Sequence, residues 1–444
     1  MSFLQTLTGK RLWRGLHVDE HKEATEKLPI RRMPFAPLLV IPLSQHNGAP
    51  AIPIVSEGQE VVRGEPIANA AGFMSIPMHA PATGIIRKLA LAPSARGDLS
   101  LAIWLAPYDS ASQEILYGAP SDIADMTPEE IVQAVQDTGV VGLGGAAFPT
   151  HVKLRPPAGR TIDTVVVNGC ECEPYLTTDH RVMLEQPAEV LYGARIAMKA
   201  LGASRAVVGV EDNKMDAVAA LRKANGGNPE ISIESVPAKY PQGAEKMLVK
   251  VLLDREIPSA GLPSEVGLAV FNVATLAQLG ELLPRRGGLI ERVVTITGPG
   301  VRKPGNYLVA LGTPLRWALE QAACTDRVSS VVLGGPMMGA AVGSLDVPIT
   351  KGVTGILVLE HEVSGRIHPC IKCAACVGVC PMSLNPSRLG LLAHKERYQE
   401  METDFHLLDC FECGCCSYVC PSHIPLVQYF RIAKQINRER KARV

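Results

Sequence analysis

The chain has 444 residues, enough for about three domains of ordinary size, and 47% of them are hydrophobic while 20% are charged. This composition predicts folded domains, and a formal net charge of zero argues against a general nucleic-acid-binding protein. We expect neither a secretory signal nor a membrane span, because the N-terminal sequence lacks a hydrophobic region and no uncharged apolar run reaches roughly 20 residues. Twelve cysteines without such a signal indicate metal ligation in a reducing compartment, and we expect a cytoplasmic protein that can dock on a membrane.

Residues 1–34 are expected to form an N-terminal extension and residues 35–110 a first domain. The domain sequence is rich in Pro, Gly, Val and Ile, with short strand-like runs separated by turns. The pattern from Val55 to Leu89 resembles the small barrel-sandwich of biotinyl and lipoyl carrier domains. No lysine stands at the turn that such carriers modify, so we expect a β-sandwich with a structural or docking role.

Residues 125–283 are predicted to form a Rossmann-like α/β domain. Its first helix should begin with Thr127 as N-cap, Pro128 at the first helical position and Glu130 closing a capping box. Strand-like and helix-like segments then alternate, starting with the apolar run TVVVNG. Alternation of this kind is typical of a parallel sheet with helices on its faces.

Two further parts follow the α/β domain. From Arg292 the pattern changes to strand, Gly/Pro turn, strand and short helix, so residues 288–360 are predicted to form a small α+β module. Residues 361–435 contain two cysteine runs with a helical pattern between them, which predicts a mostly helical domain. The predicted fold class is therefore multidomain α/β.

The two cysteine runs share the spacing C-x-x-C-x-x-C-x-x-x-C-P. Thiolates at this spacing hold [4Fe–4S] clusters, and in two-cluster ferredoxins the fourth cysteine of each run ligates the other run's cluster. Disulfides and zinc are the alternatives, but zinc sites usually show two separate CxxC pairs. We predict a first cluster on Cys370, Cys373, Cys376 and Cys420, and a second on Cys410, Cys413, Cys416 and Cys380.

A glycine-rich loop contains Gly142, Gly144 and Gly145 and fits the pattern GxGxx[G/A]. The dinucleotide-binding fingerprint requires a strand before such a loop, whereas a helix is predicted here, so the motif alone is weak. Glycines still allow backbone N–H groups to converge on a phosphate, and Lys153 follows as a point charge. A flexible loop between helices with a solvated lysine fits these residues equally well.

Polar residues follow the apolar run TVVVNG in the sequence NGCECEPY. Ligands of open α/β sheets gather at the carboxyl ends of strands. Asn168 suits the edge or ribityl chain of a flavin, and Glu173 suits a ribose hydroxyl or a nicotinamide carboxamide. The pair Cys170 and Cys172 is a poor metal site, since no second ligand pair lies nearby.

Four segments, 139–154, 168–184, 239–252 and 270–279, look like the flavin- and NADH-binding subunit of respiratory complex I. With the motifs QHNGAPAIPIV and MHAPATG, nearly the whole chain is similar to the C subunit of the Rnf electron-transport complexes. The resemblance implies that the α+β module is β-grasp-like, that FMN is bound non-covalently, and that NADH binds near Glu171 and Glu173. The FMN contacts that it implies are Gly142, Gly144, Gly145, Lys153, Asn168, Tyr240, Gly243 and Asn272.

The chain departs from the complex I subunit within these motifs. Val141 and Leu143 stand where that subunit has arginines, Cys170 replaces an aspartate, and Ala244 replaces the first of two glutamates, leaving Glu245. The C subunit of the Rnf complexes shares the change in the glycine loop, so FMN binding is expected to persist.

The resemblance implies the NADH-binding peripheral subunit of a membrane-bound, ion-translocating NADH:ferredoxin oxidoreductase, at the cytoplasmic face of the bacterial inner membrane. Electrons from NADH would pass by way of FMN and the clusters to a ferredoxin-like iron–sulfur subunit and finally to ferredoxin, while other chains form the integral membrane subunits. Flavin is needed because a hydride carries two electrons and a cluster accepts one. The alternatives are a soluble corrinoid-reductase-like flavoprotein and a non-enzymatic electron-wiring scaffold with a decayed flavin site.

Overall fold

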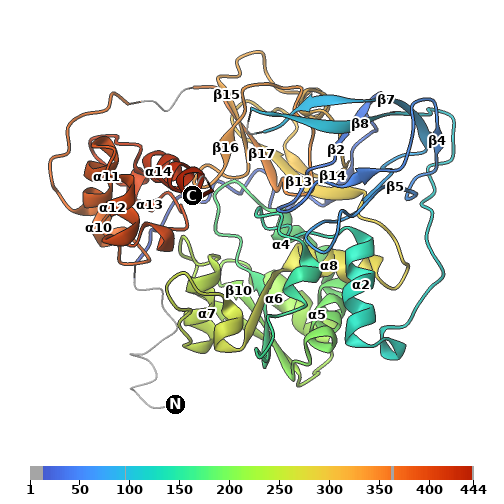
Figure 1. Ribbon diagram of the computed structural model, residues 1–444, viewed down its shortest axis with the longest axis horizontal. Helices are drawn as coiled ribbons and strands as arrows, with labels where there is room; N and C mark the ends of the chain where they lie inside the picture. The colour runs from blue at the N-terminus through green and yellow to red at the C-terminus, as the bar shows by residue number, and fades with distance from the viewer. Residues whose placement is uncertain (1–13, 96, 362–364, 443–444) are drawn as a thin grey trace.

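The structure is a computed structural model that describes residues 14–95, 97–361 and 365–442. Four folded parts follow one another along the chain (Figure 1): two small sheets in blue, an α/β domain in green and yellow, an orange sheet and a red helical domain. Hydrogen bonds join the α/β domain to each of the other three parts. The arrangement is the predicted multidomain α/β fold.

The first part consists of two small antiparallel sheets that share one buried core. Ile41, Ile67 and Ile103 come from both sheets and are at most 2% exposed. The strand-and-turn pattern of this region therefore forms the predicted sandwich. One sheet contains, in order, β2 (Leu39–Pro42), β8 (Leu99–Pro107), β7 (Gly84–Pro93) and β4 (Glu60–Val61), and the other contains β3 (Ile52–Pro53), β5 (Pro66–Asn69) and β6 (Met78–His79).

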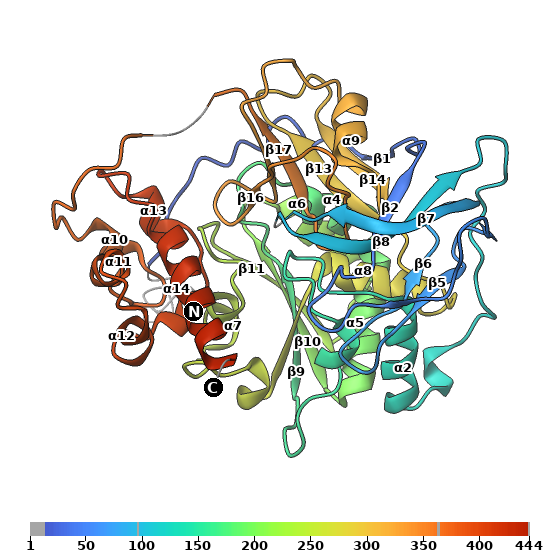
Figure 2. The ribbon, with the colours of Figure 1, turned by 45° about the horizontal axis from the view of Figure 1, so that its top comes forward.

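The α/β domain is built on a four-stranded parallel sheet covered by helices on both faces (Figure 2). Val165 and Val167 share a core with helices α5 and α8, while Val166 between them packs in the core of α7. Such alternation follows from the period of two in a strand. The sheet order is β11 (Ile231–Val236), β10 (Arg205–Glu211), β9 (Thr164–Gly169) and β12 (Leu268–Asn272), and the helices named are α5 (Pro187–Leu201), α7 (Glu245–Leu253) and α8 (Val273–Leu282).

The order of this sheet reverses between β9 and β12, because the chain moves from β9 to β10 and β11 on one side and returns to the other side for β12. The carboxyl ends of β9 and β12 therefore form the switch point where ligands of open α/β sheets bind. The predicted capping box is present at the start of α2 (Pro128–Thr138): Glu130 N donates to Thr127 Oγ1 at 3.3 Å, and Thr127 N donates to the Glu130 carboxylate at 2.7 Å.

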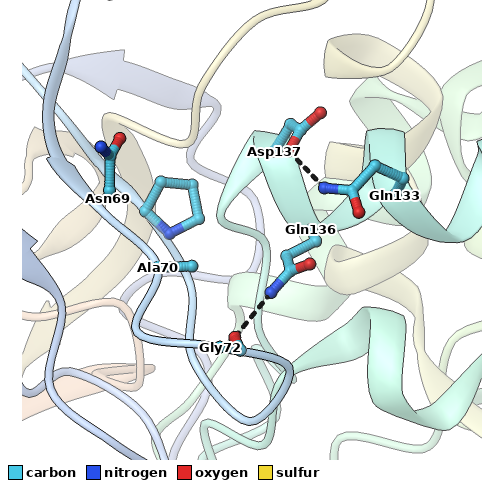
Figure 3. Close-up of a pocket in the computed structure, with 7 residues that line it drawn as sticks. Asn69, Ala70, Gly72, Gln133, Gln136 and Asp137 are labelled. Atoms are coloured by element: carbon cyan, nitrogen blue, oxygen red, sulfur yellow. Dashed lines mark hydrogen bonds between the residues drawn. The ribbon is translucent and has the colours of Figure 1, made fainter.

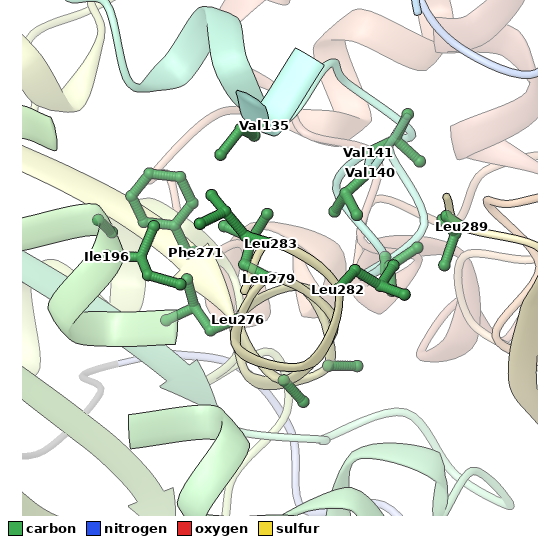
Figure 4. Packing of buried hydrophobic residues seen from close by; sticks show 14 of the residues in the cluster. Val135, Val140, Val141, Ile196, Phe271, Leu276, Leu279, Leu282, Leu283 and Leu289 are labelled. Atoms are coloured by element: carbon green, nitrogen blue, oxygen red, sulfur yellow. The ribbon is translucent and has the colours of Figure 1, made fainter. Parts of the chain in front are cut away.

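Helices α5 and α8 pack closely because a glycine of each stands at their contact. A Cβ added at Gly193 would lie only 1.9 Å from Leu276 O, and one at Gly280 would lie 2.1 Å from Glu189 O. Figure 4 shows the leucines of α8 in the surrounding core, together with Phe271 at the end of the sheet. The remaining helices of the domain are α3 (Thr150–Lys153), α4 (Thr178–Glu185) and α6 (Met215–Asn225).

The third part is a six-stranded mixed sheet with one helix, α9 (Leu315–Gln321). Its edge strand β1 comes from the predicted N-terminal extension and pairs in parallel with β14. The described residues of the extension, from position 14 onward, are thus part of the folded structure. The sheet order is β1 (Ile30–Arg32), β14 (Gly305–Ala310), β13 (Glu291–Thr297), β17 (Gly355–Leu359), β15 (Ser330–Leu333) and β16 (Ala340–Ala341).

The fourth part is helical and contains both cysteine runs, each with a short helix inside the run and a longer helix after it. Leu389, Met401 and Phe430 are at most 1% exposed and form its core. Among the described residues, no helix is long and apolar enough to cross a bilayer. The helices are α10 (Ala375–Val379), α11 (Pro386–His394), α12 (Tyr398–Thr403), α13 (Cys415–Tyr418) and α14 (Leu426–Ala442).

A hollow of about 270 Å³ lies between the first part and helix α2 (Figure 3). Gln136 Nε2 donates to Gly72 O at 3.0 Å across it, and Gln133 Nε2 donates to Asp137 Oδ1 at 2.9 Å. None of its lining residues belongs to the predicted flavin site. It is a junction between domains, lined by Asn69, Ala70, Gly72, Pro77, Gln133, Gln136 and Asp137.

A buried lysine joins three of the four parts. Lys351, which is 1% exposed, donates through Nζ to Gly139 O at 2.7 Å after α2 and to Pro77 O at 3.3 Å in the first part. Its backbone N–H donates to Gln45 Oε1 at 3.1 Å. Burial lowers the pKa of the Lys351 ammonium from 10.5 to about 7.

The substitution Lys351→Met should remove a pH dependence of stability. Between pH 7 and 10.5 the unfolded chain binds a proton at this lysine that the folded chain has largely released, so wild-type stability rises with pH, by up to about 1.4 kcal/mol per pH unit. Thermal unfolding at pH 7, 8 and 9 should show the wild-type melting temperature rising relative to that of the variant. Lys27→Met, at a lysine whose side chain is 89% exposed, is the control. Parallel profiles for wild type and Lys351→Met would contradict this assignment.

Candidate functional site

Two asparagines define the switch point of the α/β sheet. Asn168 and Asn272 are register partners at the ends of β9 and β12. Asn272 Oδ1 caps helix α8 by accepting from Ala274 N at 2.9 Å, and its Nδ2 donates to Asp179 Oδ2 at 2.6 Å. Asn168 Nδ2 donates to Gly243 O at 2.8 Å. The parallel register therefore brings two predicted site residues together although 104 positions, 272 − 168, separate them in sequence.

The glycine loop lies directly against this switch point. A Cβ added at Gly144 would lie 3.4 Å from the Asn272 Cβ, and Leu143 N donates to Thr275 Oγ1 of α8 at 2.9 Å. From the other side, Arg292 Nη2 donates to Leu143 O at 2.9 Å. The loop is therefore anchored by two domains, and the alternative of a loosely attached loop does not describe it.

The same loop offers groups that suit a phosphate. Gly145 has φ +108°, and an added Cβ there would meet nothing within 4 Å, so the backbone is open at this point. Lys153 lies one short helix later, where its Nζ donates to Val270 O at 3.1 Å and stands 3.5 Å from the Glu245 carboxylate. The Lys153 side chain is 38% exposed, so an anion can reach it.

The segment that contains Tyr240 and Gly243 passes very close to the end of β9. A Cβ added at Gly243 would lie 2.3 Å from Cys170 O and 3.3 Å from Cys172 Sγ, so this approach requires glycine. Glu245 begins helix α7 immediately after it. Gly142, at the start of the glycine loop, donates through its N–H to Phe148 O at 2.8 Å, which closes that loop.

The two glutamates of the NGCECEPY motif have different surroundings from those that the sequence suggested. Glu171, 7% exposed, accepts hydrogen bonds from Asp179 N at 2.9 Å and His180 N at 3.2 Å in the first turn of α4. Glu173 accepts from Met337 N and Met338 N at 3.1 and 2.8 Å in the third part. Both carboxylates thus already bond backbone N–H groups.

Burial shifts the pKa values of two carboxyl groups here to near neutrality. Burial raises the pKa of Glu173 to about 7, although its two backbone hydrogen bonds favour the ionised form. Burial also raises the pKa of Asp179 to about 7, with repulsion from Glu171, while the bond from Asn272 opposes the shift. Carboxyl groups whose pKa values are perturbed in this way make this strand end a candidate functional site.

Sequence reasoning missed three residues that hold this site. Lys22, 4% exposed, comes from the N-terminal extension and donates through Nζ to Glu171 O at 2.5 Å. Arg292 and Asp179, described above, are also buried. The only sequence signal for Arg292 is a charge at the start of an apolar strand, and Lys22 lies in a polar segment without periodicity.

The N-terminal segment covers part of the carboxyl edge of the sheet. Leu16 forms an antiparallel bridge with Tyr240, and Tyr175 N donates to Glu20 O at 2.8 Å. Beneath it lies a cavity of about 50 Å³, lined in part by Glu211 and Cys172. Glu171, one of the residues predicted to lie near NADH, also lines this cavity.

The flavin-domain residue Tyr240 reaches directly into the cluster domain. Its side chain is 2% exposed, and its hydroxyl donates to Cys413 O at 2.5 Å. Cys413, Cys415 and Tyr240 form one small apolar cluster, against which Cys172 packs. Tyr240 was predicted as a flavin contact, and the structure adds this contact with a predicted cluster ligand.

All twelve cysteines lie in the described residues as free thiols, and the eight cysteines of the two runs lie in the helical fourth part. Burial raises the pKa of Cys376, and repulsion from Cys420, Cys370 and Cys373 adds to the shift. Cys420 of the second run is thus close enough to interact with Cys376 of the first run.

Cys380 of the first run likewise interacts with a cysteine of the second run, Cys410. Burial raises the pKa of Cys410 to about 11, with smaller contributions from Cys413 and Cys380. No described side chains converge on a point that would hold a single metal ion. A cube of four irons is wider and needs thiolates farther apart, and two sets of four thiols suit that chemistry.

These features define a flavin and iron–sulfur protein of electron transfer. Four family profiles match successive parts of the chain: "RnfC Barrel sandwich hybrid domain" at 10–108, "Nuo51 FMN-binding domain" at 135–281, "SLBB domain" at 293–341 and "4Fe-4S dicluster domain" at 369–424. They confirm the predicted fold class and the predicted FMN and iron–sulfur cofactors.

Relatives extend this likeness over the full chain. The C subunit of the proton-translocating ferredoxin:NAD(+) oxidoreductase complex of Clostridium ljungdahlii is 41% identical over 96% of this chain and 93% of the relative. The C subunit of the Na(+)-translocating complex of Acetobacterium woodii is 39% identical over 95% of this chain and 96% of the relative. The chain belongs to the family of C subunits of the Rnf ion-translocating electron-transport complexes, as its motifs predicted.

Some relatives are longer, and one solved structure shares the fold. The C subunit of the ion-translocating oxidoreductase complex of Pasteurella multocida is 39% identical over 98% of this chain, but only 53% of that relative is covered. A crystal structure of an NAD+-reducing [NiFe]-hydrogenase in the H2-reduced state has 18% identity and a TM-score of 0.51, covering 74% of this chain and 70% of that one. The likeness to the hydrogenase is one of fold.

The substitution Tyr240→Phe should destabilise the contact between the flavin and cluster domains. It leaves the Cys413 carbonyl without its hydrogen-bond donor, which should lower the stability of the folded protein by about 1–3 kcal/mol. The half-life of the iron–sulfur absorbance in mild denaturant should therefore shorten relative to wild type. Tyr418→Phe, at a tyrosine 59% exposed, is the control and should have no effect. Equal half-lives for all three proteins would contradict the role of this hydroxyl.

Proposed function

We propose that this chain is the NADH-binding peripheral subunit of a membrane-bound, ion-translocating NADH:ferredoxin oxidoreductase. The names of the relatives in C. ljungdahlii and A. woodii support the reaction. Its partners are a ferredoxin-like iron–sulfur subunit, integral membrane subunits that move the ion, and ferredoxin indirectly. We assign it to the cytoplasmic face of the bacterial inner membrane, where NADH is available.

FMN binding is assigned to residues around the switch point. The open backbone at Gly145 and the ammonium of Lys153 suit the phosphate, with Gly142 and Gly144 shaping the loop. Asn168 and Asn272 lie at the paired strand ends, and Gly243 O accepts a hydrogen bond from Asn168. We assign these three residues, together with Tyr240, to the ring and ribityl chain. A bound flavin accepts the two electrons of a hydride and releases them singly, as iron–sulfur clusters require.

NADH is assigned to the same face, near Glu171 and Glu173. Glu171 accepts a hydrogen bond from Asp179 N in the first turn of α4, and the Asp179 carboxylate accepts one from Asn272. Glu171 thus holds the start of α4 beside Asn272, which supports a positioning role for this carboxylate. Glu173 links the flavin domain to the third part, so a nucleotide held near it would contact both domains.

We infer the order of the two clusters from the burial of their cysteines and from the Tyr240 contact. The Tyr240 contact is the observation that carries the proposal. Cys380, Cys413 and Cys416 are 6–9% exposed, and Cys413 receives the hydrogen bond from the flavin domain. Cys370 and Cys373, by contrast, are exposed. We therefore assign the second cluster to the flavin side and the first cluster to the exit toward the partner.

Gentle anaerobic purification should yield about one FMN per chain, released on denaturation, because the flavin is held without a covalent bond. Anaerobic addition of NADH should then bleach both the flavin and the iron–sulfur absorbance. A preparation with full iron content and no FMN would favour the scaffold function and would contradict both enzyme functions. Co-purification with hydrophobic subunits separates the complex from a soluble reductase.

The substitution Cys370→Ala should remove one cluster and spare the other. Iron content should fall from about eight to about four atoms per chain, because each cluster needs four thiolates. Iron analysis and electron paramagnetic resonance (EPR) of the reduced protein would measure the loss. Cys324→Ala, at a cysteine in the third part, is the control. Unchanged iron in Cys370→Ala would contradict the ligand assignment.

A further inference from the structure

The loop that carries Cys370 and Cys373 forms an exposed surface with apolar side chains at its centre. Ile367 and Ile371 are 54% and 67% exposed, and both cysteines are exposed as well. Figures 1 and 2 show this orange-red loop at the outer left edge of the molecule, away from the α/β domain. Two isoleucines of this exposure in one loop, beside two exposed cysteines, make a local apolar patch, and such patches can mark contact sites.

Hydrogen bonds hold this loop in place on the second cysteine run. His368 N donates to Ser422 O at 2.9 Å, and Ser422 Oγ donates back to Pro369 O at 3.0 Å. Cys370 Sγ lies 3.9 Å from Ser387 Oγ of α11, and Leu391, one turn later on that helix, is 45% exposed. The apolar surface therefore extends from the loop onto α11.

Within the stretch of sequence that forms this surface, the charged residues are all basic. The chain has 44 basic and 44 acidic residues, yet the stretch 365–395 contains no Asp or Glu. Arg366, Lys372 and Lys395 form no ion pair with other described residues, whereas Arg388 stands 3.8 Å from Glu400. The other half of the domain is different, because Lys434 pairs there with Glu412 at 2.8 Å.

We propose that this surface, composed of Arg366, Ile367, Ile371, Lys372 and Leu391 around the two thiols, docks the acidic face of a one-electron iron–sulfur carrier protein. The inference rests on the proposed function and identifies the surface at which electrons pass from this chain to its partner. Opposite charges steer the encounter and orient the carrier, and a small apolar centre excludes water while still allowing release. An anionic membrane would also attract these cations, but lipid would cover the exposed ligands of a cluster instead of bringing a redox centre to them.

The exchange at this surface is a single-electron transfer. A cluster held by Cys370, Cys373, Cys376 and Cys420 would give one electron to the carrier in each encounter, or take one from it, and no atom or proton would move. Two encounters therefore account for the two electrons of one NADH, and NAD+ and one proton are released at the flavin side.

The double variant Arg366→Glu/Lys372→Glu tests the surface by binding. The probe is an acidic two-[4Fe–4S] ferredoxin, with both proteins oxidised and without NADH, at about 50 and 300 mM salt. The wild-type chain should bind the probe at low salt at least ten times more tightly than the variant, and the difference should shrink at high salt. Arg195→Glu/Lys223→Glu, which makes the same charge change on α5 and α6, should bind like wild type.

A second variant, Ile371→Ser, separates the apolar centre from the charges. It should weaken binding by a similar factor at both salt concentrations, because an apolar contact is not screened. Iron content and EPR spectra of every variant should match those of wild type, so that a folding defect cannot mimic lost docking.

Several results would overturn the proposal. Wild type could fail to bind the probe at either salt concentration, or both double variants could lose binding equally, which would indicate net charge alone. Capture of wild type but not of Arg366→Glu/Lys372→Glu by phosphatidylglycerol vesicles, without ferredoxin binding, would identify a lipid surface instead. Failure of the proposed function is a separate result, because loss of NADH bleaching does not affect binding between oxidised proteins.

Discussion

The hydrogen bond from the Tyr240 hydroxyl to the Cys413 carbonyl joins the flavin site to the cluster domain, and much of the structure serves to fix it. Tyr240 is held from one side by its bridge to Leu16. On the other side its segment continues to Gly243. Only a glycine can lie so close to the end of β9, because a Cβ there would clash with Cys170 O. The position of the cluster domain thus depends on the same strand end at which we propose that the ligand binds.

The N-terminal segment connects three of the folded parts in one pass. Gly15 N donates to Val379 O in the cluster domain, Lys22 bonds the strand end of the flavin domain, and β1 joins the sheet of the third part. A single segment that crosses these boundaries restrains their relative positions at little cost in chain length. Electron transfer needs such restraint, because its rate depends on the distance between centres.

Short sequence patterns were enough to predict the helices, strands and cysteine motifs. Contacts between residues far apart in the sequence could not be predicted from such patterns. The capping box at Thr127 and the cysteine spacing each lie within a few residues, and the run TVVVNG is apolar throughout, so sequence alone predicted them. By contrast, Lys22 meets Glu171 across 149 positions and Tyr240 meets Cys413 across 173. Nothing local distinguishes these residues. For the same reason the sequence did not indicate that the Glu171 carboxylate caps α4.

The central claim is that the second cluster stands between the flavin and the first cluster. Rapid-freeze EPR after mixing with NADH tests it directly in a Cys413→Ala variant, which lacks a ligand of the second cluster. The proposed order predicts that the first cluster, still present by iron analysis, is reduced much more slowly than in wild type, because its electrons must then cross the distance that the second cluster otherwise bridges. Reduction of the first cluster at the wild-type rate in that variant would contradict the proposed order.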